Sequence, residues 1–143
     1  MKTDLAKILS VSGQHGLFSY LAQARNGVIA EALADKKRVH FDSHSKVSTL
    51  NDIAIFTSEG EMRLADVFTA MKAAADSGKA VPSAKEDAAA IKAFFVAAVP
   101  NYDEDRFYVS HMKKVIDWYH ELAQNASLEF VTDEEREKEL EEA

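Results

Sequence analysis

The chain has 143 residues, 47% apolar and 29% charged, which is typical of a globular protein large enough to bury its own core. No apolar run approaches the ~20 residues of a membrane-spanning helix, and the absence of cysteine excludes disulfides and thiolate chemistry. The N-terminal residues 1–5 lack the apolar stretch of a secretory signal. We therefore expect a cytoplasmic protein with no membrane partner.

The net charge of −7 is concentrated at the C-terminal end. Residues 129–143 contain eight acidic and two basic residues, a net charge of −6, whereas residues 1–128 sum to −1. The body of the protein therefore has room for a local basic patch. Thr132 begins a sequence typical of a helix cap, but the tail has little to bury. We expect 129–143 to be disordered or a frayed helix.

The first 58 residues predict a β-rich domain. Apolar residues spaced as one helix face predict a short helix over 4–11. Asn26-Gly27 is typical of a hairpin with a type I′ turn, because both residues tolerate positive φ. Extended segments are expected at 17–24, 28–34, 38–42 and 52–57. Four or five short strands with tight turns predict a small SH3-type β-barrel over 1–58.

Residues 59–128 predict a helical domain. Leu64, Val67, Phe68 and Met71 follow the spacing of one helix face. The same pattern, with Pro100 as a stop signal, predicts helices over 63–75, 84–99 and 110–124. Three helices of this length joined by short loops form a bundle of helix-turn-helix size. The overall fold class predicted is α+β.

Two groups of motifs are distinctive. The first comprises Ile8-Leu9-Ser10-Val11-Ser12-Gly13, Gly16-Leu17, Asn26-Gly27, Lys46-Val47-Ser48-Thr49-Leu50 and Ile53-Ala54-Ile55-Phe56-Thr57. The second comprises Pro100-Asn101-Tyr102-Asp103 and the segment from Arg106 to Tyr119, RFYVSHMKKVIDWY. Together they resemble a family of small uncharacterised bacterial proteins that carries only a domain-of-unknown-function label. The resemblance implies an SH3-type barrel followed by a helical, winged-helix-sized domain, and it implies no activity or cofactor.

His40, Asp42 and His44 alternate along one strand face and are the candidate ligands of a metal ion. Two imidazoles and a carboxylate suit zinc or non-haem iron. However, His40 and His44 would be about 13 Å apart on a straight strand, too far to share one ion. We expect a solvated polar strand face and no bound metal.

The acidic loop 101–106 lies between two predicted helices and places oxygen atoms at alternate positions, as a calcium-binding EF-hand does. The loop lacks the glycine and the closing glutamate of an EF-hand. We therefore expect a structural loop in which Asp103 or Asp105 pairs with Arg106. Two tyrosines are expected to pack across the helix junction: Tyr102 and Tyr108.

Basic and aromatic residues form the candidate interaction surface. Lysines in turns and on helix faces are commonly just solvated, and Asp35 and Asp117 partly neutralise the two basic clusters. The aromatic residue at 118 is expected in the core or at a subunit interface. The candidate residues are Lys36, Lys37, Arg38, His40, Arg106, Tyr108, Lys113, Lys114 and Trp118.

Motifs for catalysis are lacking, since the sequence has neither a phosphate-binding glycine loop nor a GxSxG elbow. We therefore expect no enzyme and no cofactor. The favoured hypothesis is a non-catalytic protein-interaction or adaptor module that binds a protein partner or itself through a sheet edge or the helix around Trp118. The alternative is a nucleic-acid-associated regulator that uses the basic hairpin and helix. The net charge favours the first hypothesis, and a small-ligand sensor is a distant third.

Overall fold

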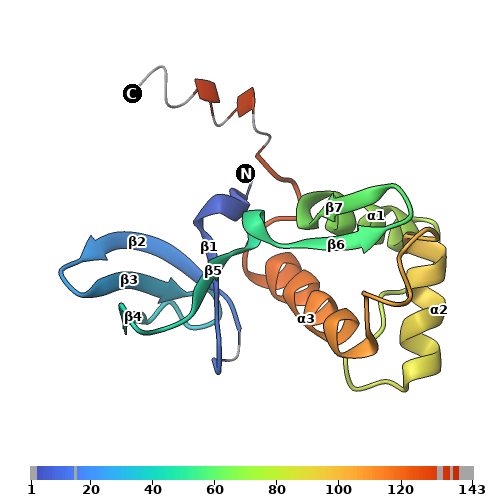
Figure 1. Cartoon of the computed structure of the whole chain (residues 1–143), viewed down its shortest axis with the longest axis horizontal. Coiled ribbons are helices and arrows are strands. Elements are labelled where there is room, and N and C mark those ends of the chain that lie inside the picture. Colours follow the sequence, from blue (N-terminus) through green and yellow to red (C-terminus); the bar gives the residue numbers. More distant parts are fainter. Residues whose placement is uncertain (1–2, 15, 132–133, 136, 139–143) are drawn as a thin grey trace.

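The computed structural model describes residues 3–14, 16–131, 134–135 and 137–138 (Figure 1). Strands precede helices along the chain, which agrees in part with the predicted α+β organisation. The elements are β1 Ile8–Val11, β2 Phe18–Ala24, β3 Gly27–Ala32, β4 Arg38–Asp42, β5 Val47–Thr49, β6 Ala54–Thr57, β7 Gly60–Arg63, α1 Leu64–Asp76, α2 Ala88–Ala98 and α3 Val109–Asn125, with 3-10 turns at Leu5–Lys7 and Leu50–Asp52.

Five strands form an antiparallel sheet in the order β4-β3-β2-β1-β5, and β6 pairs with β7 in a separate hairpin. The predicted SH3-type barrel, expected to be partly closed, is wrong, because β4 and β5 are the two edges of the sheet and do not pair in the described part of the chain. The edge strand β5 has three residues, all used to pair with β1. Such a short edge cannot supply the staggered ladder that closure requires. The β2–β3 hairpin extends away from the helices (Figure 1).

The predicted helix over 4–11 is also wrong. A single 3-10 turn, in which Asp4 accepts a hydrogen bond from the Ala6 N–H, leads directly into β1. Both faces of β1 are buried: Ile8 belongs to the main core, whereas Leu9 and Val11 belong to a smaller core on the other side of the sheet. A strand with two buried faces lacks polar alternation, so its apolar residues can coincide with a helical spacing.

The smaller core lies under one face of the five-stranded sheet. Its buried members come from β1, β2, β3 and β4, and the rings of Phe18 and Phe41 meet edge to face with centroids 4.9 Å apart. Alternation along each strand turns these side chains to the same face. The cluster consists of Leu9, Val11, Phe18, Ala30 and Phe41.

The predicted hairpin at Asn26-Gly27 is confirmed, but its turn differs from the expected type. Ala24 pairs with Gly27, so Arg25 and Asn26 are the turn residues. Among the described non-glycine residues only Lys36 has a positive φ, which rules out a type I′ turn. Gly27 is instead the first residue of β3, has a φ of +155° and lies opposite Asp42 of β4.

The three predicted helices are confirmed, with shifted ends. α2 begins at Ala88, four residues later than expected, because the Asp87 carboxylate caps it by accepting the Ala90 N–H at 2.8 Å. The strands β5 and β7 were not predicted, since each has only three or four residues. β7 forms a tight hairpin with β6 that ends in the pair Thr57 and Gly60.

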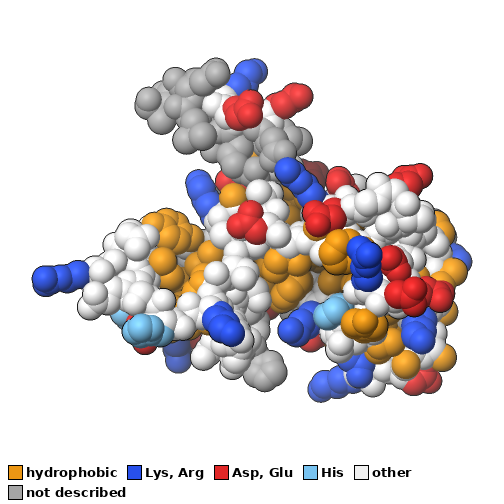
Figure 2. All heavy atoms as spheres, in the orientation of Figure 1, with side chains coloured by type: hydrophobic (Ala, Val, Ile, Leu, Met, Phe, Trp, Pro, Cys, Tyr) orange, Lys and Arg blue, Asp and Glu red, His pale blue; other side chains and the backbone are white. Residues whose placement is uncertain are grey.

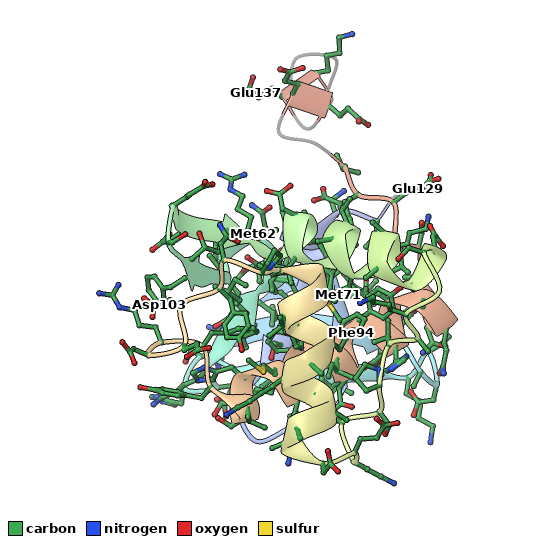
Figure 3. All side chains as sticks on the ribbon, turned by 90° about the vertical axis from the view of Figure 1, so that its right-hand side faces the viewer. Met62, Met71, Phe94, Asp103, Glu129 and Glu137 are labelled. Carbon is green, nitrogen blue, oxygen red and sulfur yellow. The ribbon has the colours of Figure 1, made fainter. Side chains whose placement is uncertain are left out.

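The main core is shared by the sheet side and the helical side of the molecule. Leu5, Leu17 and Leu50 from the first fifty residues pack in the same cluster as the buried faces of all three helices. Met71 of α1 and Phe94 of α2 both belong to this core, and both are labelled in Figure 3, in which α2 faces the viewer. The boundaries at residues 58 and 128 stay predictions.

Residues beyond α3 return to the N-terminal end of the chain. The Thr3 hydroxyl donates to Ser127 O and accepts from Ser127 N–H, and Phe130 lies against the Phe68 ring. Glu137 lies away from the body of the molecule (Figure 3). Thr132, the predicted helix cap of the tail, lies outside the described residues. No helix within the described ranges is long and apolar enough to cross a membrane.

A carboxylate connects α3 to the sheet. Glu121 Oε1 accepts the Leu17 N–H at 3.0 Å. Burial raises the pKa of the Glu121 carboxyl, the hydrogen bond from Leu17 opposes this, and Asp117 adds to the rise. Because the raised pKa favours the protonated form in the folded state, the linked stability is present below the unfolded pKa and is lost as pH rises through the folded pKa.

We expect Glu121→Gln, which keeps the acceptor oxygen, to remove this pH dependence, so that the variant gains stability relative to wild type between acidic and neutral pH. Glu121→Ala should lose about 1–2 kcal/mol, because the Leu17 N–H is left without a partner. Urea unfolding of the three proteins at pH 4 and pH 7.5 measures both effects. If the difference in free energy of unfolding between the wild type and Glu121→Gln is the same at pH 4 and pH 7.5, the linkage is contradicted.

Candidate protein-interaction groove

A groove of about 270 Å³ runs between the strand β6 and the helix α3. Its floor is apolar and comes from the main core, whereas its rim carries aromatic and basic side chains. The residues that line it are Ile53, Ala54, Ile55, Phe56, Leu64, Arg106, Phe107, His111, Lys114, Val115 and Trp118. We call this feature the β6–α3 groove.

One wall of the groove is the backbone edge of β6 that does not pair with β7. At the far end of this edge, Phe56 O accepts the Asp103 N–H at 2.9 Å. Hydrogen-bonding directions alternate along an antiparallel strand, so the N–H and C=O of Ala54, two residues earlier, point to the same side. The loop after Tyr102 turns away from β6 because its Asp105 N–H bonds to the Asp103 side chain. An edge backbone is therefore presented to the groove.

The other wall is a stripe of α3. A different stripe of α3 faces the core and holds the helix in place. Its buried side chains are Met112, Val115, Ile116, Tyr119 and Leu122. The neighbouring stripe, His111, Lys114 and Trp118, has the spacing of one helix face and turns toward β6. Trp118 is partly buried against the main core, so its indole forms part of the floor.

Arg106 closes one end of the groove over Phe56. The guanidinium lies 5.0 Å from the Phe56 ring centroid, and its Nε is 3.7 Å from Asp103 Oδ2. The sequence left two partners open for Arg106, Asp103 and Asp105, and the structure shows Asp103. Arg106 is exposed and Asp103 is only partly buried, so the pair contributes little stability and the guanidinium remains available to a ligand.

The two tyrosines of this loop behave differently. Tyr102 packs against Phe107 with ring centroids 5.7 Å apart, as predicted. Tyr108 does not pack across the junction, because it is 56% exposed and its ring lies beside His111. The Tyr108 N–H donates to His111 Nδ1 at 3.4 Å at the start of α3, which leaves Nε2 of this lining residue for other contacts.

The groove differs from the rest of the molecule in charge. Among the described residues that line it, Arg106, His111 and Lys114 are basic and none is acidic. The chain as a whole carries a net charge of −7. Figure 2 shows blue and pale blue side chains next to orange ones on the face where β6 and α3 lie.

The structure brings together only part of the predicted interaction surface. Arg106, Lys114 and Trp118 line the groove, Tyr108 contacts it through His111, and Lys113 is the next residue to Lys114 on α3. The other four candidates lie on the β3–β4 hairpin and line no part of the groove: Lys36, Lys37, Arg38 and His40. All four are exposed.

Eight of the eleven described residues that line the groove were not candidates from the sequence, and two of these, Phe56 and Ala54, carry the proposed binding. Phe56 was placed in a strand but not in a site, and Ala54 contributes through its backbone. A large apolar residue at the outward position of a strand, next to the inward Ile55, is the signal that could have found Phe56. The open edge at Ala54 has no sequence signal.

Asp42, one of the candidate metal ligands, instead stabilises a turn. Asp42 Oδ1 accepts the backbone N–H groups of His44 and Ser45 at 2.9 and 3.0 Å. This arrangement stabilises the turn that leaves β4. Within the described ranges, no group of three or more histidine, aspartate or glutamate side chains could hold a metal ion.

Fold and groove together define an α+β protein with an open strand edge facing a helix. Residues 5–50 match a domain of unknown function, DUF5606, and residues 53–122 match a second one, DUF6852. A protein from Bacteroides vulgatus, whose solution NMR structure is a Northeast Structural Genomics Consortium target, is 38% identical, with 85% of this chain and 87% of that chain covered and a TM-score of 0.68. No curated protein matches the chain.

The chain therefore belongs to this family of uncharacterised proteins of unknown function. The resemblance noted in the sequence is confirmed. All residues that line the β6–α3 groove lie within the segment that matches DUF6852.

Proposed function

We propose that this protein is a non-catalytic protein-interaction module whose binding site is the β6–α3 groove. The observation that carries the proposal is the open edge of β6 beside an apolar floor, facing an exposed stripe of α3. An edge strand offers unpaired backbone groups to another chain. A helix opposite such an edge leaves a slot in which an extended segment can add as a further strand.

The groove has the chemistry of a peptide site. Main-chain hydrogen bonds to Ala54 supply affinity for any extended segment, and side-chain contacts select among segments. Phe56 and Trp118 supply the large aromatic surfaces that dominate the energetics of protein interfaces. Phe56 is 36% exposed, so a partner would remove its apolar surface from water.

The nucleic-acid alternative has weaker support. Its two basic clusters lie on different elements, the β3–β4 hairpin and α3. The basic residues of the groove are mixed with apolar side chains instead of forming a continuous cationic surface.

Selection of random displayed peptides on the full chain tests the proposal. We expect the enriched peptides to change the fluorescence of Trp118, the only tryptophan, because it forms part of the groove floor. Phe56→Ser should lower the affinity of these peptides about tenfold, as expected for the loss of one large apolar contact at an interface. Val96→Ser is the matched control, since Val96 is 54% exposed on α2 and lies outside the groove.

Failure takes two forms. If no peptide is enriched, or if Phe56→Ser and Val96→Ser bind the enriched peptides equally well, the groove is not a protein-binding site.

Labelled mixed-sequence RNA and DNA are titrated in parallel. Nucleic-acid binding that salt and Lys37→Glu both abolish would support the alternative function instead.

A further inference from the structure

We infer that the β6–α3 groove accepts an acidic extended segment of a partner protein, with a carboxylate beside Lys114 and an apolar side chain on Trp118. The inference rests on the proposed function and adds the chemistry of the partner. It follows from the charge of the lining, from the groups that remain available there and from the repeat distances of the two walls.

Each basic group of the groove can meet a carboxylate. Lys114 forms no ion pair with any carboxylate in the described part of the chain, and it is exposed on the rim. Arg106 uses Nε to pair with Asp103, so the two terminal guanidinium nitrogens remain available to a carboxylate of the partner. His111 uses Nδ1 to accept the Tyr108 N–H. Since no described residue of the lining is acidic, the basic groups on the α3 side and at Arg106 attract a negative segment.

The repeat of a strand matches the stripe of α3. Alternate residues of an added strand point to the same side, about 6.6–6.8 Å apart. Successive positions of the stripe, His111, Lys114 and Trp118, rise by about 4.5–6 Å along the helix axis. Side chains two residues apart in the bound segment can therefore contact neighbouring positions of the stripe. The expected pattern is an acidic residue two positions from a large apolar one.

The probe is an acetylated and amidated peptide with glutamate and leucine in turn at every second position and threonine between them, so that both face the same side. The matched neutral peptide has glutamine in place of glutamate. Titration into the full chain, followed by Trp118 fluorescence, should show about tenfold tighter binding of the glutamate peptide at low salt, since several rim charges contribute together. Added salt should remove most of this difference, because rim charges are screened.

Two neighbouring lysines separate a local contact from a general charge effect. Lys114→Glu should weaken the glutamate peptide about tenfold, whereas Lys113→Glu should change its affinity by less than about twofold. Both lysines are exposed on α3, but only Lys114 lines the groove. Equal losses in the two variants would overturn the assignment of the carboxylate to Lys114.

N-methylation of alternate peptide amides tests the strand addition. Methyl groups on the amides that face β6 should abolish binding, and those on the other set should be tolerated. If both sets are tolerated, the segment does not add to β6.

The remaining outcomes separate this inference from the proposed function. Equal binding of the glutamate and glutamine peptides would overturn the acidic preference and leave the interaction module standing. Failure of both peptides, together with failure of the displayed library, would overturn both proposals. A wild-type protein that is dimeric in light scattering and becomes monomeric in Lys114→Glu would identify a second copy of this chain as the occupant, in place of another protein.

Discussion

Phe95→Ala should lower the free energy of unfolding by about 3–5 kcal/mol, the cost of removing a buried phenylalanine. Phe95 is completely buried on α2. Its ring meets those of Phe94 and Phe107 edge to face, with centroids 5.6 and 5.2 Å apart. The substitution therefore leaves a cavity in the core that joins α2 to the segment before α3, and it also removes two favourable ring contacts.

Val96 provides the control for this prediction. It is the next residue on the same helix but is 54% exposed, so Val96→Ala should change stability by no more than about 0.5 kcal/mol. Urea unfolding followed by circular dichroism compares the two variants. A similar, small loss in both would mean that α2 does not bury the face assigned to it.

The substitution Phe95→Ala should also affect binding in the β6–α3 groove. Phe107, which contacts Phe95, also lines the β6–α3 groove. A cavity behind Phe107 lets its ring move, so Phe95→Ala should weaken groove-binding peptides even under conditions where the variant is fully folded.

Gly27→Ala should cost roughly 2–4 kcal/mol, because the added Cβ collides with a neighbouring backbone and the residue has an unfavourable φ. An ideal Cβ at Gly27 would lie 1.9 Å from Phe41 O and 2.8 Å from Asp42 Cα. These atoms belong to the backbone of β4, which cannot move without breaking the ladder between β3 and β4. The loss should therefore be concentrated in the five-stranded sheet.

Gly60→Ala is the control that separates the steric clash of the added Cβ from the strain of a positive φ. Gly60 also has a positive φ, +108°, but a Cβ there would have no atom within 4 Å. Its substitution should cost only about 1–2 kcal/mol, the strain of the backbone alone. Amide hydrogen exchange should show lost protection in β3 and β4 for Gly27→Ala only. Equal costs for the two variants would show that β4 does not approach Gly27 so closely.

Three helices were predictable because each carries a long apolar stripe of period 3.6 with a stop signal nearby. α1 is the clearest case, where Leu64, Val67, Phe68 and Met71 are all buried as expected. Short elements were less predictable. β5 and β7 have too few residues to show a period, and the apolar residues of β1 mimic a helical stripe because both of its faces are buried.

Side-chain chemistry identified part of the groove before its shape was known. Arg106, Lys114 and Trp118 were chosen because exposed basic and aromatic residues are common in binding surfaces, and they line one groove. The same reasoning selected Lys36 and Lys37, which lie on a separate hairpin. Residue type alone cannot say which charged residues converge.

By itself, the sequence determined the helices, the hairpin at Asn26-Gly27, the pairing of Arg106 with a nearby aspartate and membership of the family, because these depend on local spacing or on motifs. Only the tertiary structure decided that the sheet stays open and that Phe56 and the edge of Ala54 face α3. The physical reason is that strand pairing is non-local. Whether a backbone edge is covered or open depends on which distant segment reaches it, and here the loop after Tyr102 turns away and leaves the edge of β6 exposed.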